Sequence, residues 1–387
     1  MSQRIFVIGS FAKGYSGFRG PILAQLNDAG CDVHLVCSEH DQDDLDFFAS
    51  IGVTYHAAPL QRTGLNPFND FKYAKYLTAL FREHKPDIVF CYAQKPVVFG
   101  VPAAHKAGVK NINALMPGLG YLFSEGTGLK KKIAKAVAVR LHKRAKGLIQ
   151  NLFFVNPNDH ADFKAAGLIG KQADVTILPG EGKDLSHFAV CPMPTDRPPG
   201  FNLITRLLAD KGVPDFVEAA KIVKKAHPEA VFDLIGPYDD NPRAVQPDEV
   251  AGWVDEGLIA FHGVTTDVRP YIENTTATVL PTTYREGLPN ILLEGMAIGR
   301  PIVTYENAGA SQAIESPEEI EPGLARGTNG FLIAPKRVDL LAKALLMLID
   351  EPGLAESMGK AGRAFAEERF DVSKINSQIM KQIGVVE

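Results

Sequence analysis

Short apolar runs alternate with amphipathic segments of helical length along the first half of the chain. The expected strands are near-continuous apolar runs, and most are followed by a segment with a period of three to four residues. The expected strands are residues 5–10, 32–37, 53–58, 87–92, 111–115, 148–155 and 175–178, and the helical segments include 20–29, 70–84 and 129–146. Strands that are apolar on both faces are typical of a parallel sheet covered by helices. The pattern predicts a doubly wound α/β domain over residues 1–190.

The alternation stops at residues 191–200, where four of the ten residues are proline, and then restarts. Such a proline density excludes a helix or a central strand and predicts a linker. The later strands are expected at 201–205, 231–235, 259–264, 277–281, 301–305 and 331–333, and closing helices at 338–348, 353–368 and 372–383. We therefore predict a second Rossmann-like domain over 201–370 and a final helix in 371–387 that can cross back to the first. Ligands bind beyond the carboxyl ends of parallel strands, so we expect the two domains to face each other across a cleft.

Composition places the chain among ordinary globular proteins, with 45% apolar and 22% charged residues. No apolar run approaches the roughly 18 residues of a membrane-spanning helix. The amino terminus lacks the basic start of a signal peptide, and the four cysteines have neither zinc nor redox spacing. These features predict a cytoplasmic protein.

Charge is distributed unevenly between the two halves. Residues 1–190 carry 22 Lys and Arg against 16 Asp and Glu, whereas the remainder carries 19 against 29. The basic first half indicates an anionic partner, for which nucleic acid, a lipid surface and a phosphorylated substrate all fit.

Two segments in the second half carry candidate chemistry for a diphosphate. After the strand that ends near residue 281, Gly287 allows close approach of a ligand, and a helix starting near Pro289 would direct its N–H groups at phosphate. Glu286 and Glu294 lie eight residues apart, roughly 12 Å along a helix, which is comparable to the reach from a hexose to a ribose across a diphosphate. The same pattern also fits a solvated helix with two surface glutamates.

The second segment follows the first strand of the second domain. Arg206 and Lys211 lie on one strand-to-helix loop, with a helix expected from about Val213. Two cations on such a loop can clamp a diphosphate, Arg through a bidentate fork and Lys as a point charge. A solvated basic loop that binds no ligand fits the same residues equally well.

Together with residues 329–335, these two segments resemble the second domain of the family 4 glycosyltransferases, retaining enzymes of the GT-B fold. The likeness covers residues 201–350, and more loosely the first domain at 117–123 and 156–159; it is nearest to bacterial enzymes of lipid-linked oligosaccharide, capsule and O-antigen assembly. It implies that Arg206 and Lys211 neutralise the diphosphate and that Glu286 contacts the donor hexose. Our hypothesis is that Glu286, as a positioning and charge-stabilising group, is the most catalytically sensitive residue. The resemblance also implies the remaining donor contacts, namely Glu294 at the ribose, Val264 near the base, and Gly287, Leu288 and Asn290 along the phosphates.

Two departures from the family pattern concern the sugar and the acceptor. Many relatives carry a histidine near the donor sugar where this chain has Pro117, which removes one sugar contact. Residues 308–314 lack a charged pair that is frequent there, and an acidic stretch over 315–322 follows.

Two features of the first domain are candidates for substrate or membrane contact. Residues 10–20 form a glycine-rich segment without dinucleotide-binding spacing, which we interpret as a substrate-contacting loop. Its expected contributors, with a later glycine, are Gly17, Arg19, Gly20 and Gly118. The helix expected at 129–146 is strongly basic and carries Leu129, Ile133, Val137 and Leu141 as an apolar stripe. The stripe can pack inward while the cations face anionic lipid, or the cations can simply be solvated. The expected membrane patch is Lys130, Lys131, Lys132, Lys135, Arg140, Lys143 and Arg144.

The resemblance implies a retaining transferase that moves a hexose or N-acetylhexosamine from a nucleotide diphosphate sugar, with UDP favoured, to a polyprenyl-diphosphate-linked saccharide. We expect no metal, because the ten histidines have no zinc-binding spacing, no other cofactor, and no nucleic-acid partner. The expected location is peripheral, on the inner face of the cytoplasmic membrane. A sugar-nucleotide epimerase of the same fold and a non-catalytic sugar-binding protein remain alternatives.

Overall fold

A computed structural model provides the structure, which describes residues 2–11, 15–38, 40–60, 67–118, 129–241, 243–284 and 287–386. The chain forms two compact units. The first contains residues 1–181 and 372–387, and the second contains residues 182–371. The predicted boundary at residue 190 and the predicted linker at 191–200 therefore lie within the second unit.

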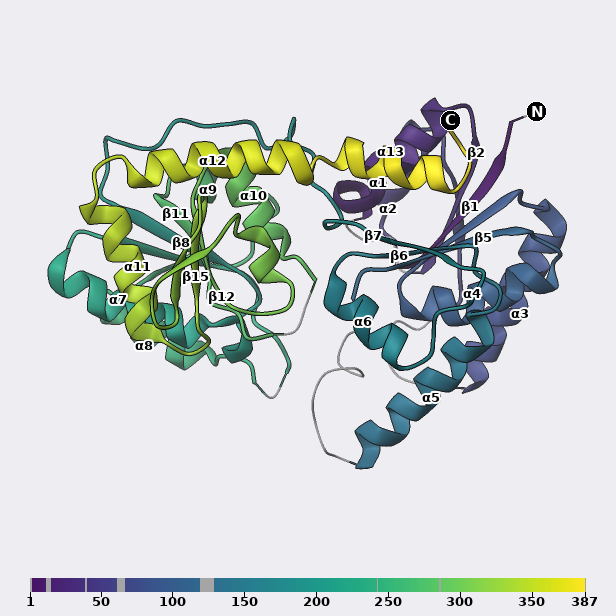
Figure 1. Cartoon of the computed structure of the whole chain (residues 1–387), viewed down its shortest axis with the longest axis horizontal. Coiled ribbons are helices and arrows are strands. Elements are labelled where there is room, and N and C mark those ends of the chain that lie inside the picture. Colours follow the sequence, from purple (N-terminus) through teal and green to yellow (C-terminus); the bar gives the residue numbers. More distant parts are fainter. Residues whose placement is uncertain are drawn as a thin grey trace. The chain divides into compact units, whose positions relative to one another are not determined.

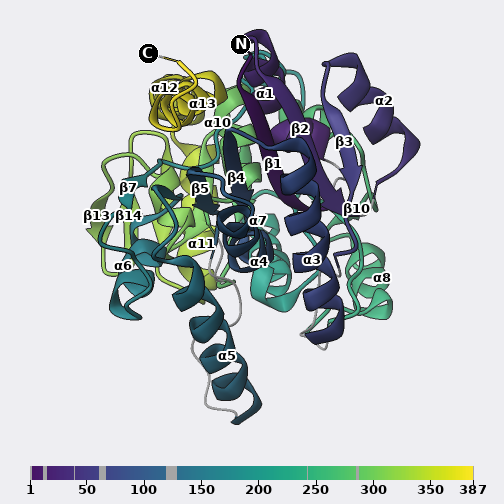
Figure 2. The same cartoon turned by 90° about the vertical axis from the view of Figure 1, so that its right-hand side faces the viewer.

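The first unit is built on a seven-stranded parallel sheet of order β3-β2-β1-β4-β5-β6-β7 (Figures 1 and 2). Its strands are β1 (Arg4–Phe11), β2 (Asp32–Ser38), β3 (Thr54–Ala57), β4 (Ile88–Tyr92), β5 (Asn111–Met116), β6 (Asn151–Phe154) and β7 (Asp174–Ile177). The inner strand β1 pairs Val7 with Leu35 of β2 and with Phe90 of β4. All seven strands lie where the apolar runs predict them, with ends that differ by up to three residues.

Helices cover both faces of this sheet, so it has a hydrophobic core on each side. The helices are α1 (Tyr15–Asp28), α2 (Gln42–Ser50), α3 (Pro67–His84), α4 (Gln94–Lys106), α5 (Leu129–Ala145), α6 (Pro157–Ala165) and α13 (Val372–Gln382). Figure 1 shows α1 and α13 on one face and α3, α4 and α5 on the other. The α13 residues Ile375, Ile379 and Met380 share a core with Ile5 and Val7 of β1, so the end of the chain completes the first unit.

The second unit contains an eight-stranded sheet of order β10-β9-β8-β11-β12-β15-β14-β13. Its strands are β8 (Gly200–Ile204), β9 (Val231–Ile235), β10 (Ala260–Phe261), β11 (Ala277–Leu280), β12 (Ile302–Tyr305), β13 (Glu318–Glu321), β14 (Leu324–Arg326) and β15 (Gly330–Ile333). The strands β8 to β12 and β15 are parallel, whereas β13 and β14 form an antiparallel hairpin at the edge. Both hairpin strands fall outside the predicted set.

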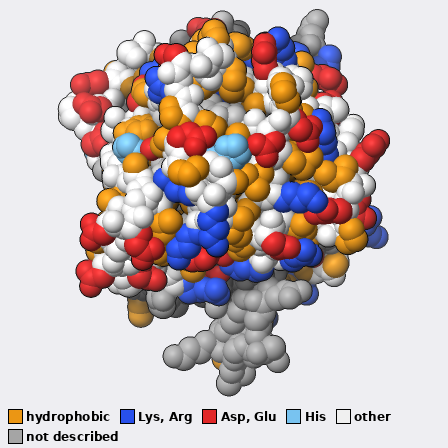
Figure 3. All heavy atoms as spheres, turned by 90° about the vertical axis from the view of Figure 1, so that its left-hand side faces the viewer, with side chains coloured by type: hydrophobic (Ala, Val, Ile, Leu, Met, Phe, Trp, Pro, Cys, Tyr) orange, Lys and Arg blue, Asp and Glu red, His pale blue; other side chains and the backbone are white. Residues whose placement is uncertain are grey.

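One hydrophobic core fills the second unit. Its helices are α7 (Val213–Ala226), α8 (Pro247–Asp255), α9 (Arg269–Glu273), α10 (Asn290–Ile298), α11 (Val338–Asp350) and α12 (Leu354–Arg369), with short 3-10 helices η2 (Ala209–Lys211) and η3 (Ala310–Ala313). On the face that Figure 3 shows, charged side chains of both signs lie among apolar ones, which is typical of a solvated surface.

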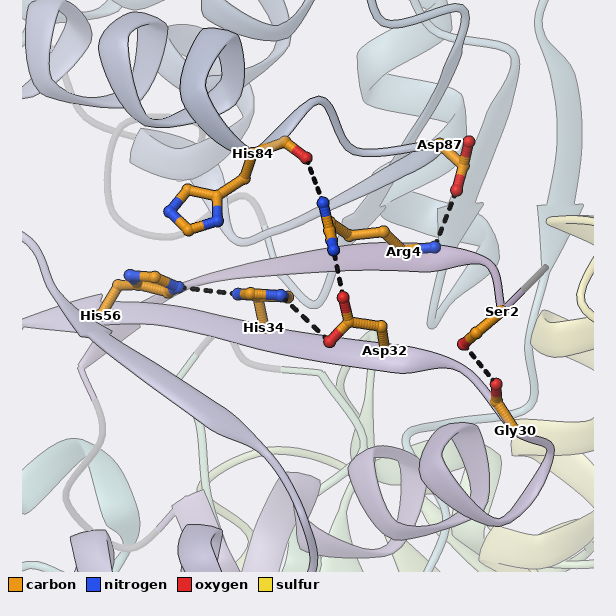
Figure 4. Close-up of polar contacts among 8 residues, drawn as sticks. All are labelled: Ser2, Arg4, Gly30, Asp32, His34, His56, His84 and Asp87. Atoms are coloured by element: carbon orange, nitrogen blue, oxygen red, sulfur yellow. Dashed lines mark hydrogen bonds and ion pairs between the residues drawn. The ribbon is translucent and has the colours of Figure 1, made fainter.

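Three histidines gather beside the first strands of the first unit (Figure 4). The His34 ring lies between Asp32 and His56, with Nδ1 2.8 Å from His56 Nε2 and Nε2 3.2 Å from Asp32 Oδ1. His84 lies beside both rings, and Arg4 donates a hydrogen bond to its carbonyl oxygen. Burial, together with the neighbouring histidines, lowers the pKa of His56 to about 4.

A fourth histidine, His142 on α5, is only 2% exposed and packs its ring edge-on against Phe163. Burial lowers its pKa from an ordinary 6.5 to about 4. The unfolded chain thus binds this proton below about pH 6.5, whereas the folded protein does so only near pH 4. Stability from neutral His142 is complete above pH 6.5 and is lost as the pH falls to 4, by up to about 3 kcal/mol.

We expect His142→Leu to reduce the acid sensitivity of the first unit. The free energy of unfolding, measured by urea titration at pH 7.5 and 4.5, should fall less with acid in this variant than in the wild type. His105→Gln changes an exposed histidine on α4 and should keep the wild-type pH dependence. An equal acid-induced loss in His142→Leu and wild type would contradict the prediction.

Candidate functional site

The carboxyl ends of the neighbouring parallel strands β8 and β11 carry the two segments singled out from the sequence. After β8, the chain passes Arg206, forms η2 and enters α7 at Val213, where the helix was predicted. Gly212 joins η2 to α7 with φ +83°, and a Cβ there would lie 2.2 Å from the carbonyl oxygen of Pro281. Only glycine allows the two loops to come this close.

Hydrogen bonds hold the loop after β8 against the loop after β11. The carbonyl oxygen of Asp210 accepts hydrogen bonds from the backbone N–H groups of Thr283 (2.8 Å) and Tyr284 (3.0 Å). On the other side, Asn307 Nδ2 donates to the carbonyl oxygen of Thr282 at 2.9 Å. Residues 282–284, which follow β11, are thereby held from both sides.

Lys211 is buried in this arrangement, with 8% of its surface exposed. Its Nζ lies 5.0 Å from the ring centroid of Tyr284, a cation–π distance. Lysine is rarely buried in proteins, so a lysine ammonium held at a loop junction is a candidate functional group.

Arg206 lies in a different environment from Lys211. Its guanidinium is about half exposed, and Nη1 forms an ion pair with Asp239 Oδ2 at 2.7 Å. Because half-exposed ion pairs contribute little to stability, this arginine can exchange its carboxylate for another anion at low cost.

Helix α10 begins at Asn290, one residue after Pro289, which has extended backbone and makes no side-chain cap among the described residues. First-turn N–H groups of an uncapped helix are an anion-binding feature. Asn290 is exposed, and Leu288 packs partly against the core. Gly287 precedes the helix, while Glu286 lies outside the described residues, so its role stays a prediction.

Glu294 is buried in α10 at 9% exposed, and its carboxylate is paired. Lys183 Nζ donates a hydrogen bond to Glu294 Oε1 at 2.5 Å. Lys183 was missed from the sequence, because a lone lysine 111 residues away from its partner leaves no local pattern. Glu294 is thus a buried, paired carboxylate in a helix whose other described side chains, apart from Asn290, are buried and apolar.

The segment expected to line the base differs from the prediction. The strand predicted over residues 259–264 is only β10, Ala260–Phe261, and Val264 lies beyond it with 71% of its surface exposed. Gly263 has φ +69°, which interrupts the extended backbone before Val264.

The prediction of a loop over residues 10–20 of the first domain is wrong from residue 15 onward. Helix α1 begins at Tyr15, so Gly17, Arg19 and Gly20 lie on its first turns. Arg19 is buried, with its guanidinium 3.9 Å over the Tyr92 ring and Nη2 3.3 Å from Glu181 Oε2. A Cβ on Gly20 would lie 2.7 Å from Phe47, so this glycine serves helix packing.

Gly118 follows β5, and its carbonyl oxygen accepts a hydrogen bond from Gln94 Nε2 at 3.4 Å. The residues after it, 119–128, lie outside the described part of the chain.

The basic helix α5 packs through a different side from the one predicted. Of the expected inward stripe, Ile133 and Val137 are exposed and Leu141 is partly buried, whereas the side chain of Leu129 lies outside the described set. The residues of α5 that are buried are Ala138, His142 and Ala145. Small residues and one ring at this spacing let the helix lie close to its neighbours. Of the predicted patch, Lys135, Arg140, Lys143 and Arg144 are exposed, whereas the side chains of Lys130, Lys131 and Lys132 lie outside the described set.

Two further features of the described residues bear on cofactor and membrane binding. Within the described ranges, no group of three or more His, Cys, Asp or Glu side chains is placed to hold a metal ion. No helix in the same residues has the length and apolar character needed to span a bilayer. Metal independence stays an expectation.

The site in the second unit therefore combines groups suited to one chemical class. A buried ammonium, an exchangeable guanidinium and an uncapped helix start carry positive charge, and a separate carboxylate lies one to two turns into the helix. Such a set can bind an anion such as a diphosphate at one end and hydroxyl groups at the other.

Comparison with known proteins shows which families the chain matches. The family description "Glycosyl transferases group 1" matches residues 199–351, and "Glycosyl transferase 4-like" matches residues 10–151. The chain is 27% identical to N,N'-diacetylbacillosaminyl-diphospho-undecaprenol alpha-1,3-N-acetylgalactosaminyltransferase of Campylobacter jejuni, over 89% of this chain and 88% of that one. It is 21% identical to the capsular polysaccharide biosynthesis glycosyltransferase CapM of Staphylococcus aureus, over 95% of this chain and 93% of that one.

The fold is also that of a known structure. The chain superposes on HepE of Anabaena, solved in complex with UDP, with a TM-score of 0.76 and 17% identity over 99% of this chain and 100% of that one. The fold predicted from the sequence is thereby confirmed. The chain belongs to the group 1 and family 4-like glycosyltransferases and has their GT-B fold.

Proposed function

We propose that the protein is a retaining glycosyltransferase that transfers a hexose or N-acetylhexosamine from a UDP-sugar to a polyprenyl-diphosphate-linked saccharide. The observation that carries the proposal is the buried Lys211, held by the Asp210 hydrogen bonds against the loop that leads into α10. The UDP complex of HepE supports the choice of base, and the Campylobacter jejuni relative, whose name specifies a diphospho-undecaprenol acceptor, supports the choice of acceptor.

The proposed chemistry needs no metal. Cleavage of the bond between sugar and phosphate leaves negative charge on the departing diphosphate, and fixed cations and N–H groups stabilise such charge. Lys211, Arg206 and the α10 N–H groups supply them. The acceptor hydroxyl attacks from the side of the leaving group, the departing phosphate takes its proton, and no carboxylate nucleophile is required. Glu286 positions the hexose.

The proposed place of action is the inner face of the cytoplasmic membrane. Helix α5 exposes Lys135, Arg140, Lys143 and Arg144, together with the apolar Ile133 and Val137. Each such cation near an anionic bilayer contributes about 1 kcal/mol to binding. Nucleic acid is not part of this proposal.

A transfer assay tests the proposed function. A thermal-shift screen of UDP- and GDP-sugars first identifies the donor, because a bound ligand stabilises the folded state. Purified protein is then incubated with that donor and a short polyprenyl-diphosphate saccharide in phosphatidylglycerol vesicles. We expect nucleotide release only with acceptor present, an α-linked product by NMR, and less turnover in phosphatidylcholine vesicles.

Other products would identify other functions. Conversion of the donor sugar without acceptor would indicate an epimerase, and binding without turnover would indicate a sugar-binding protein. A β-linked product from an α-linked donor would exclude the retaining mechanism.

A further inference from the structure

The Lys183–Glu294 ion pair has a geometry that suits nucleotide recognition. We propose that Lys183 is a positioning residue for the donor: it holds one oxygen of the Glu294 carboxylate so that the other oxygen faces the ribose hydroxyls. This inference rests on the proposed function, in which Glu294 contacts the ribose.

The ion pair engages only one of the two carboxylate oxygens of Glu294. Lys183 Nζ donates to Oε1, and among the described residues no side chain donates to Oε2. Both side chains are largely buried, with 14% and 11% of their surfaces exposed. Oε2 is therefore the oxygen left to accept hydrogen bonds from a ligand, which can offer two from vicinal hydroxyls.

The surroundings restrict Lys183 further. Its ammonium lies 4.8 Å from the ring centroid of Phe188, and the carboxylate rises from α10, where Leu293 and Gly295 are buried. A carboxylate in such apolar surroundings is costly unless it is paired, and the pair fixes its direction as well as its charge.

The main chain of Lys183 is also fixed. Its N–H donates to the carbonyl oxygen of Phe370 at 2.7 Å, and it forms a parallel bridge with Asp371. Residue 182 is the first and residue 371 the last of the second unit, so Lys183 stands where the chain enters and leaves that unit. The side chain starts from an anchored position, which lets it preset Glu294 before any ligand arrives.

In a purely structural role, Lys183 would only neutralise the buried charge of Glu294. The two roles differ in ribose discrimination, which is the ratio of the Kd values for 2′,3′-dideoxy-UDP and UDP. A hydrogen bond to a charged group contributes about 10- to 100-fold in affinity. A positioning residue changes this ratio, whereas a charge-neutralising residue lowers stability and leaves the ratio intact.

The experiment uses calorimetry on the whole chain to measure the Kd values of UDP and 2′,3′-dideoxy-UDP. GDP and 2′,3′-dideoxy-GDP are measured in parallel. For the wild type, we expect the Kd of 2′,3′-dideoxy-UDP to exceed that of UDP by about 30-fold or more. In Lys183→Met the Kd for UDP should rise about 10-fold while that for the dideoxy nucleotide changes less than twofold. Lys183→Arg should recover most of the ratio. Lys360→Met removes an exposed ion pair on α12 and should match the wild type.

A double-mutant cycle with Glu294→Gln completes the test, because coupled residues are not additive. Glu294→Gln should lose the discrimination, and Lys183→Met added to it should change the ratio no further. If Lys183→Met does not fold, Lys183→Gln carries the same expectation.

The outcomes separate the two assignments. Full discrimination in Lys183→Met or Lys183→Gln would overturn the role of Lys183 and leave the proposed function standing. A wild type that binds nucleotide without ribose discrimination would overturn the ribose assignment of Glu294 and the inference built on it.

Discussion

Replacing Lys211 by alanine is expected to lower kcat/KM for sugar transfer about 1000-fold. The buried ammonium lies at the junction of the loops after β8 and β11. In the proposed reaction, negative charge develops on the diphosphate at this junction as the sugar leaves. A single preorganised group that stabilises such charge contributes 100- to 1000-fold to the rate. The loss should appear mainly in kcat, because the charge on the leaving group is larger in the transition state than in the bound donor.

The measurement is a steady-state assay of nucleotide release with saturating acceptor. Lys211→Met keeps the apolar stem and should lose a similar factor, which separates the missing charge from any packing defect. Lys221→Ala removes a partly exposed lysine on α7 and should remain within twofold of the wild type. Turnover of Lys211→Met within threefold of the wild type would refute the assignment.

Replacing Arg300 by methionine is expected to destabilise the second unit by about 4 kcal/mol. The guanidinium is fully buried, and its two terminal nitrogens donate to the carbonyl oxygens of Cys191, Gly299, Pro192 and Glu273 at 2.8 to 3.3 Å. Methionine fills much of the space but leaves these acceptors without donors, and each unsatisfied buried group costs about 1–3 kcal/mol.

Denaturant unfolding with a fluorescence probe in the second unit, where Trp253 is the single tryptophan of the chain, measures this loss. Arg197→Met changes a partly exposed arginine in the proline-rich segment 191–200, to which Arg300 donates hydrogen bonds, and should shift the free energy of unfolding by less than about 0.5 kcal/mol. Equal stability of the two variants would show that the buried network contributes little.

The parallel strands could be predicted from the sequence because each is a short apolar run between polar boundaries. Helix α4 was not predicted, since Pro96, Gly100 and Pro102 lie within it and local rules disfavour a helix there. Burial overrides that preference: most of α4 is buried, and a Cβ on Gly100 would lie 2.9 Å from Cys91 Sγ. The β13–β14 hairpin was missed because β13 is acidic and mostly exposed, without apolar alternation, and β14 has only three residues.

The candidate site was predictable where it depends on local order along the chain. The turn between Arg206 and Val213 and the start of α10 near Pro289 follow from glycine, proline and strand ends. The pairing of Glu294 with Lys183 and of Arg206 with Asp239 depends on tertiary packing, which no local pattern encodes. The ligand contacts of these residues stay predictions.

The return of α13 to the first unit has a consequence for synthesis. Because Ile375, Ile379 and Met380 complete a core with β1, a ribosome must release nearly the whole chain before that core can close. The second unit, the contiguous segment 182–371, can fold before α13 has been synthesised, whereas the first unit cannot complete its core until α13 is present. Shortening the chain at its carboxyl end would therefore harm the domain that is made first.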